Sequence, residues 1–204
     1  MTELLAQRDA YLRVFEATVT GEANGGVLLD RTAFYPGGGG QQPDRGTLRA
    51  GERVWTVTGV RRHGEAVIHL LDGDPLPVGT VVEGAIAWPF RYRMMRTHTA
   101  LQVLCGVIWK EYGAEVTSGQ MDEDRARMDF SLEEFGAEHV RRIEERVNEE
   151  IAAGLPVEVR FLPREEAFRI PDLIRPKGNL LPPEIATIRI VDIVGLDLQG
   201  DGGT

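Results

Sequence analysis

Cysteine is almost absent from this sequence of 204 residues, in which Cys105 is the only thiol. A single cysteine cannot form an internal disulfide, which agrees with a reducing compartment. Long apolar stretches are absent too, because no run approaches the roughly eighteen residues that a membrane helix needs. The first residues also lack the basic-then-apolar pattern of a signal peptide. We therefore expect a cytoplasmic protein that has no contact with a membrane.

Positive charge is scarce as well. Lys and Arg number 23 against 32 Asp and Glu, which gives a formal net charge of −9. Phosphate contacts supply most non-specific affinity for nucleic acid, so this charge argues against broad RNA binding. It is compatible with a local basic patch, either at Arg91, Arg93 and Arg96 or at Arg61 and Arg62. The alternative is that these arginines form solvated faces and pair with the many carboxylates.

Short β-rich runs separated by glycine turns fill the first part of the chain, and apolar residues make up 42% of the whole, enough to bury a core. Asn24-Gly25 between the first two runs is a strong hairpin signal, since both residues tolerate positive φ. Several short strands at this spacing indicate a small barrel. We expect residues 1–88 to form a glycine-rich small β-barrel domain. Its strands are predicted at 12–20, 27–30, 53–60, 66–70 and 81–87.

Helical and strand patterns are mixed after Pro89, and we expect residues 89–204 to form an α+β two-layer sandwich. Thr117 and Ser118 are expected in the loop of a hairpin. Prolines between 171 and 183 exclude a long element there. The predicted elements are a helix at 92–112 that ends at Gly113, hairpin strands at 116–118 and 125–130, an amphipathic helix through Val140, Ile143, Val147 and Ile151 that ends at Gly154, a strand at 157–161, a short helix at 164–168, and a last strand at 185–194.

One helical stretch carries chemistry at its edge. Its apolar residues Leu101, Leu104, Cys105 and Ile108 have the spacing of one buried helical face, with His98 beside it. A metal ligand at 98 would need its partner one turn later, at 102, where the sequence has a glutamine. On this pattern alone, a lone histidine beside an apolar stripe is more often a partly buried histidine with satisfied hydrogen bonds than a ligand.

Four consecutive glycines at 37–40 lie between Tyr35 and Gln41, too many for a simple turn. Such a run permits positive φ and lets backbone N–H groups approach another surface closely. Composition alone favours a flexible loop. No lysine follows the glycines, which excludes a phosphate loop of the GxxxxGK[ST] type.

Three motifs resemble one family. Residues 98–104 (HTALQVL) resemble the first zinc half-motif, HxxxH, of the alanyl-tRNA editing domain, which occurs within alanyl-tRNA synthetase and as free-standing AlaX proteins. Residues 198–204 (LQGDGGT) resemble its second half-motif, in which Cys or Asp is followed by GGTH. Residues 32–46, with their glycine run, are similar to the glycine-rich motif of the medium-length AlaX class. The motifs stand in family order over nearly the whole chain.

The resemblance implies a zinc-dependent hydrolase. A zinc ion with an open coordination position can activate water and polarise an ester carbonyl. The family's ligand positions correspond here to His98, Gln102 and Asp201, while the last histidine would follow Thr204, so we expect the editing domain to be truncated at its C-terminus. Gln102 could bind zinc only through a neutral amide oxygen, a hard and weak donor. We therefore expect one zinc ion, bound weakly or absent.

The resemblance also implies the other site residues. The glycine-rich loop is expected to reach the editing pocket, which would bring Gln41 within reach of His98. We expect Gln41 and His98 to be catalytic. Substrate binding is expected from Gly38, Gly39, Gly40, Thr117, Ser118, Arg93, Arg96 and Thr204.

Two functions remain open. The first is a trans-editing hydrolase that clears serine or glycine from mischarged tRNA(Ala). The second is a homologue that keeps the tRNA and aminoacyl surface but has an incomplete metal site and hydrolyses nothing. Both have mischarged tRNA(Ala) as partner, and neither implies a membrane or a protein partner.

Overall fold

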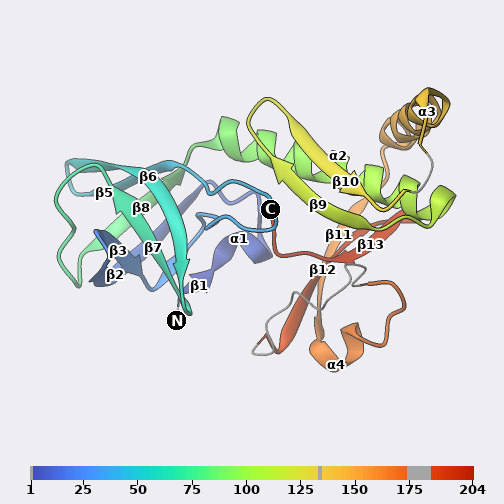
Figure 1. Ribbon diagram of the computed structural model, residues 1–204. Coiled ribbons are helices and arrows are strands. Elements are labelled where there is room, and N and C mark those ends of the chain that lie inside the picture. The colour runs from blue at the N-terminus through green and yellow to red at the C-terminus, as the bar shows by residue number, and fades with distance from the viewer. Residues whose placement is uncertain (1, 133–134, 174–184) are drawn as a thin grey trace. The chain divides into compact units, whose positions relative to one another are not determined.

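The structure is a computed structural model that describes residues 2–132, 135–173 and 185–204 (Figure 1). The chain forms two compact units. The barrel unit comprises Met1–Arg96, Met121–Asp124 and Gly203–Thr204, and the second unit comprises Thr97–Gln120 and Arg125–Gly202. We keep as a proposal the division into a barrel domain of residues 1–88 and an editing domain of residues 89–204. No described helix is both long and apolar enough to span a bilayer.

The barrel is closed by six antiparallel strands, which confirms the prediction of a small N-terminal barrel within an α+β fold. Phe15, Leu29, Leu48 and Val57 are among the side chains that fill its interior. In spatial order the strands are β2 (Val14–Ala23), β3 (Gly26–Leu29), β7 (Ala66–Leu71), β6 (Arg53–His63), β5 (Gly46–Ala50) and β8 (Val81–Ile86).

Glycine decides two places in this barrel. Asn24 and Gly25 both have positive φ in the turn between β2 and β3, as the hairpin signal predicts. Strand β5 was not predicted, because it begins with glycine and its polar–apolar alternation covers only four residues before the turn at Gly51. A Cβ atom on Gly46 would lie 2.0 Å from the carbonyl oxygen of Ala85, so only glycine lets β5 pair closely with β8.

A short N-terminal layer adds to the barrel unit. Strand β1 (Glu3–Leu4) pairs in parallel with β4 (Arg31–Thr32), and helix α1 (Leu5–Arg8) follows β1. The hydroxyl of Thr2 donates to the carbonyl of Leu29, 2.8 Å away, and fastens this segment to the end of β3.

Helix α2 (Trp88–Tyr112) is the longest element. It begins four residues before the predicted start, because Pro89 occupies its first turn, where no backbone N–H is needed. It ends as predicted at Gly113, which has a φ of +63°. The predicted apolar stripe is buried at Leu101, Cys105 and Ile108.

The second unit contains a hairpin, a three-stranded sheet and two further helices. Hairpin strands β9 (Val116–Met121) and β10 (Ala126–Phe130) follow α2, and α3 (Ala137–Ala153) ends at Gly154. The sheet has the antiparallel order β11 (Val157–Pro163), β12 (Thr187–Ile193) and β13 (Asp197–Gly200), with α4 (Arg164–Ala167) after β11. Val103 and Val107 of α2 pack with Ile193 and Leu196 beneath this sheet.

Two predictions about this unit were wrong. The strand predicted at 116–118 is confirmed, but it continues to Met121 before the polar turn, so Thr117 and Ser118 lie in strand β9 and not in the loop of the hairpin. The strand predicted at 185–194 is not the last one, since β13 follows it after a turn at Gly195, whose φ is +80°. Most of the loop predicted between 171 and 183 lies outside the described residues.

Candidate functional site

The glycine-rich loop has a defined shape. Gly37 to Gly40 all have positive φ, which side chains larger than glycine rarely adopt. The backbone N–H groups of Gly38 and Gln41 donate to each other's carbonyls, at 3.1 and 3.0 Å. The hydroxyl of Tyr35 donates to the carbonyl of Gly38 at 2.9 Å. The glycines therefore build a tight turn that presents Gln41 at its end.

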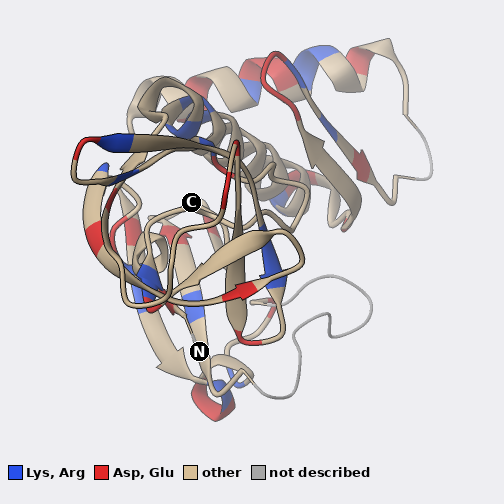
Figure 2. Ribbon diagram, turned by 90° about the vertical axis from the view of Figure 1, so that its left-hand side faces the viewer, with Lys and Arg blue, Asp and Glu red and all other residues tan. Residues whose placement is uncertain are grey.

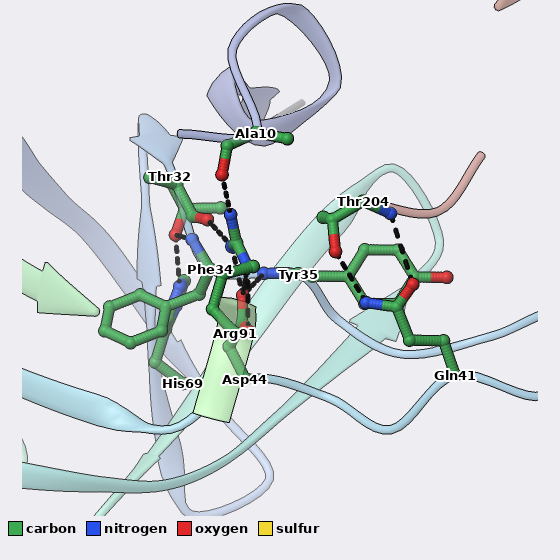
Figure 3. Close-up of polar contacts among 10 residues, drawn as sticks. Ala10, Thr32, Phe34, Tyr35, Gln41, Asp44, His69, Arg91 and Thr204 are labelled. Carbon is green, nitrogen blue, oxygen red and sulfur yellow. Dashed lines mark hydrogen bonds and ion pairs between the residues drawn. The ribbon is translucent and has the colours of Figure 1, made fainter. Parts of the chain in front are cut away.

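A buried ion pair fixes the base of this loop. The Asp44 carboxylate accepts the backbone N–H of Tyr35 at 2.6 Å and the Arg91 Nε–H at 3.0 Å (Figure 3). Arg91 also donates to the carbonyls of Ala10 at 2.8 Å and Ala33 at 2.6 Å. The exposed fractions of Arg91 and Asp44 are 0% and 1%. One guanidinium thus joins the first turns of α2 to the loop and to two further backbone segments.

The sequence left open whether the arginines before His98 form a basic patch or pair with carboxylates, and this ion pair shows pairing for Arg91. Arg91 is buried against Asp44 and is not available to phosphate. Arg93 is half-exposed and pairs with Glu123 at 3.0 Å and with Asp124 at 3.8 Å. Arg96 is exposed like Arg93, but it makes no ion pair with any carboxylate of the described ranges.

Gln41 is held by Thr204 within the barrel unit. Its Nε2 donates to the Thr204 hydroxyl at 2.7 Å, and the Thr204 backbone N–H donates to its Oε1 at 3.2 Å (Figure 3). The carbonyl of Gly40, next to it, accepts the N–H of Met121 at 2.8 Å. The exposed fraction of Gln41 is 3%. The structure therefore brings together two residues of the predicted site that belong to different motifs.

His98 and Asp201 meet in the second unit. His98 Nε2 lies 3.1 Å from Asp201 Oδ2, and both side chains are about four-fifths buried. The backbone of Asp201 is fastened on both sides to Arg189, because its N–H donates to the Arg189 carbonyl and its carbonyl accepts from Arg189 Nη1, each at 3.0 Å. The two side chains that match the zinc half-motifs are thus adjacent.

Gln102 makes a structural contact. It is buried, and its Nε2 donates to the carbonyl of Val191 at 3.2 Å. Throughout the described ranges, no three His, Cys, Asp or Glu side chains come together as a metal site would require. A catalytic zinc ion takes three protein ligands, and imidazole and carboxylate are good donors whereas a neutral amide is a poor one. His98, Gln102 and Asp201 therefore do not fit a strongly bound zinc ion.

The hairpin residues form a small polar group. The Ser118 hydroxyl donates to the Asp129 carboxylate, and Arg127 Nε donates to the same carboxylate at 2.9 Å. The Ser118 hydrogen bond, followed by that of Arg127, lowers the pKa of Asp129. Thr117, Ser118 and Arg127 are exposed, so this group is accessible on the hairpin.

One further histidine is buried in the barrel without contributing to this site. His69 Nε2 lies 2.8 Å from the Thr32 hydroxyl, and its exposed fraction is 0%. Burial lowers the pKa of His69 from 6.5 to about 4, so the imidazole is neutral at neutral pH. It is a core histidine with satisfied hydrogen bonds, as the lack of a partner at ligand spacing indicates.

Comparison with known proteins supports the motif resemblance. The family model for tRNA synthetases class II (A) matches residues 8–90. The chain is 40% identical to the alanyl-tRNA editing protein AlaX-M of Saccharolobus solfataricus and 38% identical to that of Methanosarcina barkeri, over all of this chain and 86% and 87% of those relatives. It is 37% identical to the alanine–tRNA ligase of Pyrobaculum neutrophilum, of which it covers 23%.

These matches lie in two kinds of protein, editing proteins and ligases, both named for alanine tRNA. The barrel followed by an α+β unit is therefore the region that the ligase shares with the free-standing editing proteins. The chain belongs to the AlaX-M family of alanyl-tRNA editing proteins.

Proposed function

We propose that this chain is a trans-editing hydrolase that releases serine or glycine from mischarged tRNA(Ala). The observation that carries the proposal is the 3.1 Å contact between His98 and Asp201, which come from two motifs 103 positions apart. Family membership supports the substrate class. The partner is then tRNA(Ala), and the place of action is the cytoplasm.

The reaction is hydrolysis of an aminoacyl ester. Water adds to the carbonyl carbon, the ester C–O bond breaks, and the ribose oxygen leaves with a proton. An imidazole beside a carboxylate can take up the proton of the attacking water and return one to the ribose oxygen. We assign that role to His98, with Asp201 orienting its ring. Gln41, through its amide, holds Thr204, the last residue of the motif at 198–204.

The proposal assigns zinc no catalytic step. The resemblance to the family implies a zinc ion that activates the water. Here the described ligand positions offer one imidazole and one carboxylate, while Gln102 is engaged with Val191. We propose that zinc binds this chain weakly, and no step above depends on it.

Rejection of alanine requires polar groups that recognise the serine hydroxyl, because a purely apolar pocket discriminates poorly between such small side chains. Thr117 and Ser118 are our candidates. Ser118 already donates its proton to Asp129, so its oxygen is left as an acceptor for a substrate hydroxyl. A Ser118→Ala variant should release alanine faster relative to serine than the unchanged chain does. Equal ratios for the two proteins would remove Ser118 from this role.

The second candidate function is a homologue that binds aminoacyl-tRNA without hydrolysing it. The observation that favours it is the buried Gln102, which stands where the family has a histidine. The two candidates differ in turnover, so a deacylation assay separates them.

The test measures release of labelled serine, glycine and alanine from tRNA(Ala) by the unchanged chain and by His98→Ala and Asp201→Asn. His139→Ala is the matched control, because that histidine lies on α3 and contacts the rings of Tyr112 and Phe135. We expect serine or glycine release to fall by about a hundredfold or more in the first two variants and to be unchanged in the control. Tight tRNA binding without release by the unchanged chain would establish the second candidate instead.

A further inference from the structure

An aromatic cluster with two arginines lies on the surface of the barrel unit. The Trp88 and Tyr92 rings stack with centroids 5.5 Å apart and an interplanar angle of 26°. The Tyr11 ring approaches both, with centroids 5.6 Å from Trp88 and 6.5 Å from Tyr92. The guanidinium of Arg13 lies over the Trp88 ring at 4.1 Å. We call these four residues, together with Arg96, the aromatic–arginine strip.

The strip follows from helix periodicity. Trp88, Tyr92 and Arg96 are spaced four residues apart at the start of α2, so they form one row on the helix. Tyr11 and Arg13 precede β2 and meet this row from the neighbouring segment. Three rings and two arginines therefore share one surface, which two segments of the same unit form.

Two of the three rings in this strip are exposed, and Trp88 between them is partly buried. The exposed fractions of Tyr11 and Tyr92 are 61% and 41%, well above those of ring residues in the barrel core such as Phe34 at 0%. Packing of the barrel does not require them, because the interior is filled by other side chains. Exposed, grouped aromatic rings indicate an interaction surface.

The charge of the strip is unbalanced. Neither Arg13 nor Arg96 forms an ion pair with a carboxylate in the described ranges, whereas nearby Arg8, Arg93 and Arg45 are all paired. Elsewhere, acidic and basic positions are interspersed (Figure 2). In a chain with a net charge of −9, two unpaired arginines beside stacked rings single out this strip as a place for an anion.

We propose that the aromatic–arginine strip binds unpaired nucleotides of RNA, with bases stacked on Tyr11 and Tyr92 and phosphates beside Arg13 and Arg96. Aromatic rings take any base by stacking, and arginine adds phosphate contacts and cation–π attraction. A single strand can splay its bases onto such a surface, whereas a duplex keeps them inside. The inference rests on the proposed function for one point only, that the RNA is tRNA.

The test measures binding of labelled RNA by fluorescence anisotropy, at one low salt concentration for the ring variants and over a series of salt concentrations for the arginine variants. The two probes are a short single-stranded RNA and a blunt duplex of the same sequence. The proteins are the unchanged full chain, the double variant Tyr11→Ala/Tyr92→Ala, and Tyr11→Phe/Tyr92→Phe, which keeps both rings. Phe135→Ala is the matched control, because Phe135 is a ring of the second unit with a similar exposed fraction of 54%.

We expect the double alanine variant to bind the single strand about tenfold more weakly or worse, since stacking contributes about that factor per base. The double phenylalanine variant and Phe135→Ala should bind as the unchanged chain does. Arg13→Gln and Arg96→Gln should each make affinity less dependent on salt. Equal binding by the double alanine variant overturns the inference, as does equal affinity for the blunt duplex. Self-association lost in that variant while RNA affinity persists also overturns it.

Deacylation separates this inference from the proposed function. If the chain releases no amino acid but the RNA-binding pattern holds, the proposed function fails and the strip remains an RNA-binding surface. If release occurs, the double alanine variant should raise KM for mischarged tRNA and leave kcat unchanged. An unchanged KM together with unchanged RNA binding would refute RNA binding by the strip and leave the proposed deacylase function standing.

Discussion

The Gln41 amide and the Thr204 hydroxyl form a hydrogen bond of 2.7 Å across 163 positions of sequence. The Thr204 backbone completes a second bond to the same amide at 3.2 Å, so the donor and the acceptor of the glutamine are both used. The glycine run makes this possible, because four residues with positive φ turn the loop tightly enough to present one side chain at its tip. Gln41 thereby fixes the segment that follows Asp201.

This pair should show energetic coupling. Thr204→Val removes one of the two hydrogen bonds and should reduce the free energy of unfolding by about 1 kcal/mol, Gln41→Ala removes both and should cost more, and the double variant should lose little more than Gln41→Ala alone. Urea denaturation of the four proteins measures the coupling. Gln42→Ala is the control, because Gln42 bonds Asp122 and not Thr204. Strictly additive losses would mean that the contact contributes nothing.

Replacing only one residue of the buried Arg91–Asp44 pair should strongly destabilise the folded chain. Asp44→Ala leaves the Arg91 guanidinium buried without its counter-charge, so we expect a loss of about 3 to 5 kcal/mol in the free energy of unfolding. The exposed pair Arg8–Glu3 is the control, and Glu3→Ala should lose under about 1 kcal/mol. Denaturant titration measures both. A loss in Asp44→Ala no larger than in Glu3→Ala would show that water compensates the buried arginine.

Much of the barrel could be predicted from local sequence, because its strands carry their own signals. The turn at Asn24-Gly25 needs positive φ, and the alternation after Arg53 produces a half-buried strand. Strand β5 carries a much weaker signal, a four-residue alternation that follows a glycine. It exists because Gly46 lets its backbone approach Ala85, and that requirement is visible only once both strands are paired.

The candidate site also contains residues that the sequence predicts and residues that it does not. The pairing of His98 with Asp201 could be anticipated from motifs, because the two residues match two halves of one family pattern. The role of Arg91 could not, since its partner lies 47 positions away and nothing in the local pattern distinguishes it from Arg93 or Arg96. From the sequence alone Arg91 was a candidate for a basic patch, whereas in the structure it is a buried structural residue. The proximity of Gln41 to His98 stays a prediction.

Zinc affinity should depend on position 102. Gln102→His replaces a neutral amide by an imidazole beside His98 and Asp201, so we expect zinc to bind at least about tenfold more tightly. Calorimetric titration with zinc measures the change. Gln102→Leu is the control, since it removes the amide without adding a ligand. Equal zinc affinity in the histidine and leucine variants would show that His98 and Asp201 do not form the metal site.

Acid should destabilise the barrel through His69. Its pKa is about 4 in the folded chain against 6.5 ordinarily, because burial disfavours the charged imidazole. Above pH 6.5 the imidazole is neutral whether the chain is folded or unfolded. Below that pH the unfolded chain takes up a proton that the folded chain refuses, so stability falls as the pH drops toward 4. The loss is about 1.4 kcal/mol per pH unit and about 3 kcal/mol over the whole window.

Thermal or urea unfolding at several pH values between 6.5 and 4.5 measures this loss, in a range where most carboxylates are still ionised. His69→Gln cannot titrate, so its stability curve should be flatter there by about 2.5 kcal/mol, the part of the loss that falls above pH 4.5. Replacing the ring also lowers its stability at every pH. His63→Gln is the matched control, because it makes the same substitution at an exposed residue that ends β6, outside the barrel core. Parallel curves for the unchanged chain and His69→Gln would mean that the imidazole is protonated inside the barrel, with the Thr32 hydroxyl oxygen accepting a hydrogen bond from its Nε2–H.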